Sequence, residues 1–225
     1  GLSISIKGGE RSLFESSIRY AKAFKNNAGK EKFALKINGY YLRAHDWEAN
    51  NSKPTEQSLD NEKNPGGYDA VNKYGDEFDN HNDYTSSVKT FPGLKRIYRT
   101  GYWEKDLVDY NTRNFKTAAI LQYKLTDSVD VILGSNFGTG TTVYQGDNRY
   151  SLKNILFFQN KIEVRKKDKF FIRAYATNED AGKSYDAYFT ALLLQKNAKS
   201  DLDWNTDYRN YWQNKIVPEI KLLTG

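Results

Sequence analysis

Alternation of apolar and polar residues with a period of two is the feature that most constrains this chain. In residues 114–125 it places one set of side chains on a single face: Phe115, Thr117, Ala119, Leu121, Tyr123 and Leu125. After residues 126–128 a second set follows with the same period: Val129, Val131, Leu133 and Phe137. Because successive side chains of a strand point to opposite faces, this pattern predicts two antiparallel strands joined by a tight turn.

The same period recurs along much of the chain. We expect about seven strands, at residues 2–7, 12–24, 32–44, 114–125, 129–138, 152–166 and 169–177. The connections between them fall into two classes. Those at 25–31, 126–128 and 167–168 are short, whereas those at 45–113, 138–151 and from 178 onward are long, with a tight Gly8-Gly9 turn as the exception.

Short and long connections alternate along the chain, which assigns them to opposite ends of an antiparallel meander. Outer-membrane barrels have short periplasmic turns and longer extracellular loops in this way. We therefore predict an all-β fold, an antiparallel meander that forms part of a transmembrane β-barrel. Seven strands are fewer than the usual minimum of eight, so we do not expect this chain to close a barrel alone.

The long connections have their own character. Residues 46–112 lose the period of two, hold three of the four prolines and are rich in aromatic residues, which argues against simple disorder. Residues 179–225 favour short helices: one over 185–195 with Ser184 as its N-cap, and one around Trp204 to Trp212, with Pro218 marking its end or the start of another turn. We expect both regions to be extracellular.

Composition fits this interpretation without requiring it. The mean hydropathy is −0.80 and no run of eighteen apolar residues exists, so no transmembrane helix is expected. The net charge is +6 with both signs mixed along the chain. The basic cluster at residues 165–169 lies in a predicted turn, which favours a solvated turn over a nucleic-acid surface.

Catalytic and metal-binding signals are weak. Cys is absent, and His45 and His81 are the only histidines, neither of them near a nucleophile motif. Residues 76–83 are rich in carboxylate and amide oxygens, but they lack the spacing of a calcium-binding loop, which favours a solvated loop. We expect no enzyme activity, no cofactor and no metal.

Aromatic residues in the loops are the better candidates for ligand binding. Trp and Tyr rings stack on sugars or fill peptide pockets while their polar atoms form hydrogen bonds. The candidates are Trp47, Tyr68, Trp103, Tyr110 and Tyr144. The alternative for each of them is that it packs the loops against each other.

Several segments together resemble a known family. Residues 6–12 (Ile-Lys-Gly-Gly-Glu-Arg-Ser), 18–21 and 36–48 are similar to the first barrel strands of TonB-dependent receptors of the SusC-like, Bacteroidota type. Residues 144–151 and 170–175 are similar to the strands that follow in that family.

The resemblance implies a 22-stranded outer-membrane barrel with an N-terminal plug, which imports glycans or peptides with energy delivered by TonB. It further implies the TonB complex as partner through the missing plug region, and a SusD-like surface lipoprotein beside the barrel. Residues 1–225 resemble the N-terminal third of the barrel, with the extracellular loop 46–112, the extracellular helical region 179–225 and no plug domain. The chain begins without Met, so we expect it to follow processing or to belong to a longer protein.

A barrel wall in a lipid bilayer requires outward apolar residues. We assign this position to three sets: Phe33, Leu35 and Ile37; Leu121, Tyr123 and Leu125; Ile162 and Val164. Arg in place of Leu35 or Leu121 is expected to cost about 2–4 kcal/mol if that position lies at the bilayer midplane. The alternative is a soluble, all-β, cell-surface glycan-binding module, which needs no detergent.

Overall fold

The structure is a computed structural model of the 225-residue chain that describes residues 1–58, 60–77, 79–81, 91–94 and 96–224. It contains two compact units. The sheet unit comprises residues 1–47, 109–145 and 150–185, and the loop-helix unit comprises residues 48–108, 146–149 and 186–225. Phe78, Asn82 and Asp83 of the oxygen-rich segment lie outside the described residues.

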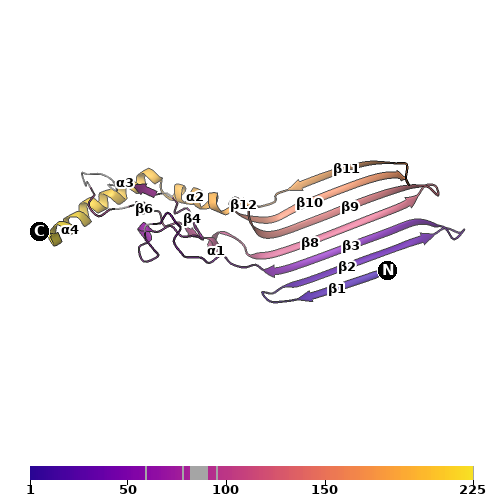
Figure 1. Ribbon diagram of the computed structural model, residues 1–225, viewed down its shortest axis with the longest axis horizontal. Helices are drawn as coiled ribbons and strands as arrows, with labels where there is room; N and C mark the ends of the chain where they lie inside the picture. The colour runs from indigo at the N-terminus through magenta and orange to yellow at the C-terminus, as the bar shows by residue number, and fades with distance from the viewer. Residues whose placement is uncertain (59, 78, 82–90, 95, 225) are drawn as a thin grey trace. The chain divides into compact units, whose positions relative to one another are not determined.

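The sheet unit is built from long neighbouring strands in the order β1-β2-β3-β8-β9-β10-β11 (Figure 1). Their bounds are Leu2–Gly8 (β1), Phe14–Lys25 (β2), Glu31–His45 (β3), Asn111–Lys124 (β8), Val129–Gln145 (β9), Arg149–Lys166 (β10) and Phe170–Asp180 (β11). The short β12, Tyr185–Asp186, pairs with β10. The prediction of an all-β, antiparallel fold is confirmed. In the described residues the sheet is open, with β1 and β11 at its edges.

The register of the sheet separates two faces. Ile4 pairs with Ile18, and Ile37 pairs with both Tyr20 and Ala119, so these residues share a face. The apolar face comprises the even-numbered residues of β1, β2, β10 and β11 and the odd-numbered residues of β3, β8 and β9. The remaining strand residues form the other face, named the polar face for its charged and amide residues, although Phe157, Phe171 and Tyr175 are also exposed on it.

The predicted long connection at residues 138–151 is wrong. Strand β9 continues to Gln145 and β10 begins at Arg149, so only Gly146, Asp147 and Asn148 connect them. Residues 139–144 are mostly Thr, Val and Tyr, which favour strands strongly enough to carry β9 past Gly138 and Gly140. The alternation of short and long connections therefore fails between β9 and β10.

The loop-helix unit contains short elements within the segment that the sequence left without periodicity. They are η1 (Pro65–Gly67), β4 (Lys73–Tyr74), β5 (Asp79–His81), β6 (Arg96–Tyr98), β7 (Tyr102–Trp103) and α1 (Glu104–Leu107). Strand β4 pairs with β7, and β5 pairs with β6. A core of Phe91, Leu94 and Ile97 packs against Trp204, Tyr208 and Trp212, so the two long segments form one unit.

Helices complete this unit: α2 (Ala187–Ala198), α3 (Asp201–Tyr211) and α4 (Val217–Thr224). The predicted N-cap Ser184 is wrong, because the carboxylate of Asp186 accepts the N–H of Phe189 at 2.9 Å. The helix around Trp204 ends as α3 at Tyr211, before Pro218. A π-helical turn follows at residues 212–216, and Pro218 is the second residue of α4, so it lies at the start of a further helical segment. None of the helices in the described residues is long and apolar enough to cross a membrane.

Candidate functional site

The apolar face of the sheet exposes large hydrophobic side chains on every long strand. They are Leu2, Ile4, Ile6, Ile18, Phe24, Ile37, Phe115, Tyr123, Leu133, Phe158, Ile162, Phe170 and Ile172. A contiguous apolar surface of this kind is rare on soluble monomers and marks contact with another apolar phase or partner. The three sets that the sequence assigned to the outside lie within or beside this face.

Two rows of aromatic residues border the apolar face. The short-turn row holds Phe24, Phe33, Tyr123 and Phe170, and the long-loop row holds Phe14, Tyr41, Phe115, Phe137 and Phe158. Neighbouring rings contact each other within the rows, with centroids 5.6 Å apart for Phe24–Phe33 and 4.8 Å apart for Phe137–Phe158.

The distance between the rows matches a lipid bilayer. Phe33 to Tyr41 on β3 and Phe115 to Tyr123 on β8 each span nine residues, and Phe14 to Phe24 on β2 spans eleven. A tilted strand crosses the hydrocarbon core in about 9–11 residues. Aromatic girdles flank the apolar band of membrane barrels at both interfaces.

The polar face carries paired charges. Glu15 accepts the Lys7 ammonium at 2.7 Å and the Tyr40 hydroxyl at 3.2 Å. Glu163 is buried, and Nε and Nη2 of the Arg173 guanidinium each lie 2.8 Å from Oε2 of its carboxylate. Such ion pairs favour a solvated or protein-lined environment for this face, in contrast to the face behind it.

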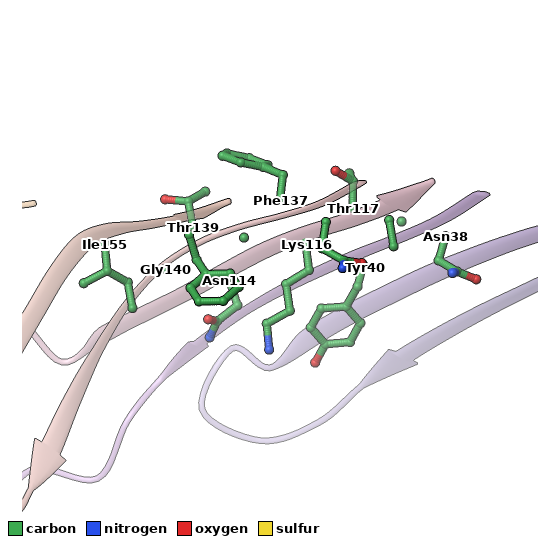
Figure 2. Close-up of a pocket in the computed structure, with 14 residues that line it drawn as sticks. Asn38, Tyr40, Asn114, Lys116, Thr117, Phe137, Thr139, Gly140 and Ile155 are labelled. Atoms are coloured by element: carbon green, nitrogen blue, oxygen red, sulfur yellow. The ribbon is translucent and has the colours of Figure 1, made fainter. Parts of the chain in front are cut away.

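A hollow of about 430 Å³ lies on the polar face across β3, β8, β9 and β10. Figure 2 shows Tyr40, Lys116 and Asn114 on one side of the strands, while Phe137 and Thr139 point to the other side. The lining residues are Asn38, Gly39, Tyr40, Asn114, Lys116, Thr117, Ala118, Asn136, Phe137, Gly138, Thr139, Gly140, Ile155 and Phe157. Amide groups, a tyrosine and one lysine suit a polar ligand with hydroxyl or peptide groups.

Glycines on β9 help to form this hollow. A Cβ at Gly140 would lie 2.5 Å from Oδ1 of Asn114 and 3.2 Å from the carbonyl oxygen of Arg113. At Gly138 it would meet only Cγ of Lys116, at 3.8 Å. A side chain at position 140 would therefore displace the Asn114 side chain and crowd the Arg113 carbonyl oxygen, whereas Gly138 mainly leaves space open.

Buried charges stabilise the loop-helix unit. The carboxylate of Glu104 accepts the Tyr74 hydroxyl at 2.6 Å and the Arg149 guanidinium at 2.8 Å. Burial raises the pKa of Tyr74, and the hydrogen bond to Glu104 adds to this shift. Arg99 donates to Asp201 at 2.7 Å and to the carbonyl oxygens of Gln195 and Lys199, which ties the β6 segment to the helices.

Asp76 is fully buried in the same unit. One of its oxygens accepts the N–H of Ala70 at 3.3 Å and lies 3.8 Å from Nζ of Lys73, while Oδ1 has no hydrogen-bond partner. Burial raises the pKa of Asp76 to about 8, and the neighbouring carboxylates of Asp69 and Glu77 contribute to the increase. No group of three acidic or histidine side chains that could hold a metal ion occurs in the described part of the chain.

The five aromatic residues proposed for ligand binding are divided between the two units: Trp47, Tyr110 and Tyr144 belong to the sheet unit, and Tyr68 and Trp103 belong to the loop-helix unit. Trp47 is 72% exposed and stacks with the Arg11 guanidinium, 4.4 Å from its ring centroid. Tyr144 is 55% exposed and lies on β9, not in a loop. Tyr68 and Tyr110 are buried, at 2% and 4% exposed, and Tyr68 and Trp103 both lie near the Lys73 ammonium. Trp47 and Tyr144 therefore retain the most ring surface for a ligand.

The hollow residues were not proposed from the sequence. Their signal was present as polar residues two positions apart within strands: Asn38 and Tyr40, then Asn114 and Lys116. That pattern also occurs on any solvated strand, so only the register shows that these positions share a surface. Comparison of the chain with known proteins found no matching family model, no matching curated protein and no matching solved structure.

Proposed function

We propose that this chain supplies wall strands to a TonB-dependent, SusC-like receptor of the outer membrane, which imports a glycan or a peptide. The observation that carries the proposal is the apolar face between two aromatic rows, backed by a face of paired charges. A lipid bilayer on one side and a water-filled or plugged lumen on the other suit these two surfaces.

Incomplete pairing at both edges of the sheet supports a larger barrel. Strands β1 and β11 each have one neighbour in the described sheet, so one side of each backbone is unpaired. In hydrocarbon, each unpaired N–H or C=O group costs several kcal/mol, which is about the free energy of a hydrogen bond lost in an apolar phase. Further strands of the same protein would close the barrel, as the resemblance to a 22-stranded receptor implies.

The polar face would then line the lumen, and its hollow would offer amide and hydroxyl contacts to the passing ligand or to a plug. The long connections at 46–112 and 179–225 would be extracellular, and Trp47 and Tyr144 of the sheet unit retain exposed rings for the ligand. The proposed partners are the lipid bilayer, the TonB complex through a plug region, and a SusD-like lipoprotein. This function is transport and requires no catalytic residue.

Uptake measurements test the proposal. Cells with and without the intact receptor are supplied with labelled glycans and peptides, one class at a time. We expect loss of the receptor to abolish uptake of one class, and a variant of TonB that cannot deliver energy to do the same. Equal uptake of every glycan and peptide by both strains would contradict an importing role.

Fractionation tests the rival function of a soluble glycan-binding module. The wall assignment predicts that the protein sediments with outer membranes and is monodisperse only in detergent. A protein that is monodisperse without detergent would support the soluble module.

A further inference from the structure

Charged residues on the apolar face lie near the strand ends, and two of them are adjacent arginines. Arg43 on β3 and Arg113 on β8 are direct cross-strand partners, and both side chains are exposed. Each lies two residues beyond the long-loop aromatic residue of its own strand, because Tyr41 precedes Arg43 and Phe115 follows Arg113. Two strand residues correspond to about 7 Å, which places both guanidinium groups just outside the apolar band.

This arginine pair has no neutralising carboxylate in the part of the chain that the structure describes. Among the described residues, neither Arg43 nor Arg113 forms an ion pair. The two nearest acidic residues in the sequence have other partners. The Asp46 carboxylate accepts a hydrogen bond from the backbone N–H of Trp47 at 2.8 Å. The Asp109 carboxylate accepts a hydrogen bond from the backbone N–H of Asn111 and lies 3.5 Å from the Lys153 ammonium. Like charges directly opposite each other destabilise a sheet, so an anion bound between the two guanidinium groups would reduce their repulsion.

The surroundings favour a lipid as the source of the anion. Phe14 is the other cross-strand partner of Arg43, and the Arg43 guanidinium lies 5.8 Å from the Phe14 ring centroid. Thr141 is the partner of Arg113 on the next strand. The pair thus has the Phe14 ring on one side and the polar Thr141 on the other. Tyr41 and Phe115 lie towards the middle of the strands, where acyl chains would lie.

We propose that Arg43 and Arg113 bind the phosphate group of a lipid headgroup at the long-loop border of the apolar face. Guanidinium groups recognise phosphate with two parallel hydrogen bonds, and two adjacent arginines suit a phosphomonoester better than a zwitterionic headgroup. The inference rests on the proposed function, because it requires the apolar face to lie in a bilayer.

Lipid retention tests this site. The full-length protein in detergent is mixed with equal amounts of phosphatidic acid and phosphatidylcholine of the same acyl chains, and retained lipids are counted by native mass spectrometry. We expect at least about tenfold preference for phosphatidic acid, as one bidentate pair is worth roughly 1.4 kcal/mol or more. The R43Q/R113Q double variant should lose this preference.

Matched variants separate the site from general charge. K36Q/K124Q removes two positive charges from the polar face of the same two strands and should keep the preference. R43K/R113K keeps the charge but loses the bidentate geometry and should show an intermediate preference. Equal lipid preference in R43Q/R113Q and K36Q/K124Q would overturn the site.

Two further measurements distinguish failure of the lipid site from failure of the proposed wall assignment. Flotation of the wild-type protein with phosphatidylcholine liposomes reports membrane insertion alone. Flotation without a preference for phosphatidic acid would overturn the site and leave the wall assignment intact, whereas no flotation would overturn both. Displacement of phosphatidic acid by millimolar inorganic phosphate would indicate a site for soluble anions and would overturn the assignment to lipid.

Discussion

Lys22 lies on the apolar face of β2, between Phe14 and Phe24, and its ammonium lies 5.2 Å from the Phe24 ring centroid. A lysine stem can cover apolar surface while the charged end reaches the membrane interface. The direction of Lys22 towards the short-turn row is consistent with this behaviour. The proposed wall assignment therefore predicts that depth on the apolar face decides what a charge costs.

Substitution of Ile37 tests depth on the apolar face. Ile37 lies midway between Phe33 and Tyr41, so Ile37→Arg should cost about 2–4 kcal/mol of stability in the membrane. Leu35→Arg should cost less, because Leu35 pairs with Lys22 near the short-turn row. The measurement is reversible unfolding by denaturant in liposomes.

Lys36→Arg, on the polar face of the same strand, is the matched control and should change stability little. Equal losses in Ile37→Arg and Lys36→Arg would show that the two faces are in the same environment and would contradict the assignment.

Asp76 predicts a pH dependence of the loop-helix unit. Its pKa is about 8 in the folded state, above the value of 3.8 in the unfolded chain, so the folded state retains a proton that the unfolded state loses. Stability should therefore be complete below pH 4 and fall by up to about 1.4 kcal/mol per pH unit as pH rises towards 8. Asp76→Asn should remove this dependence and raise stability at pH 8.

Tryptophan fluorescence during denaturation provides the measurement, since Trp103, Trp204 and Trp212 lie in this unit. Asp127→Asn, at an exposed acid in the β8–β9 turn, should leave the pH profile unchanged. A profile of Asp76→Asn that is identical to wild type would refute the role of burial at Asp76.

At the level of single elements, the strands were predictable and some boundaries were not. The period of two predicts β8 because Phe115, Thr117, Ala119, Leu121 and Tyr123 place a largely apolar set at every second position. In β9, Gly138 and Gly140 have no side chains to continue the pattern, so the strand end was placed seven residues too early. Glycine weakens a strand locally, but neighbouring strands on both sides supply the ladder that holds it.

The N-cap of α2 allows a prediction about the stability of this helix. Asp186→Ala removes the side chain that accepts the N–H of Phe189 and should destabilise the loop-helix unit by about 1 kcal/mol. Asp186→Asn keeps an accepting oxygen and should lose little. Thermal unfolding followed by circular dichroism checks both variants, and equal melting temperatures for Asp186→Ala and wild type would contradict the cap.

At the level of the whole molecule, the sequence could not place distant segments together. Phe91 and Trp212 belong to regions more than a hundred residues apart, and only the structure shows that Nε1 of Trp212 donates to the carbonyl oxygen of Pro92 at 2.9 Å. The same holds for the hollow, which four strands create jointly. Local periodicity defines faces, whereas the sites on them depend on register and tertiary packing.

The most direct test of the central claim, that the apolar face contacts lipid, uses spin labels along β8. The chain contains no cysteine, so single cysteines at positions 115 to 124 can each be labelled without background. In reconstituted membranes, we predict that odd positions collide mainly with oxygen dissolved in lipid. Even positions should collide mainly with a water-soluble nickel chelate, or with neither quencher where protein covers them. Odd positions that are as accessible to the nickel chelate as even positions would contradict the claim.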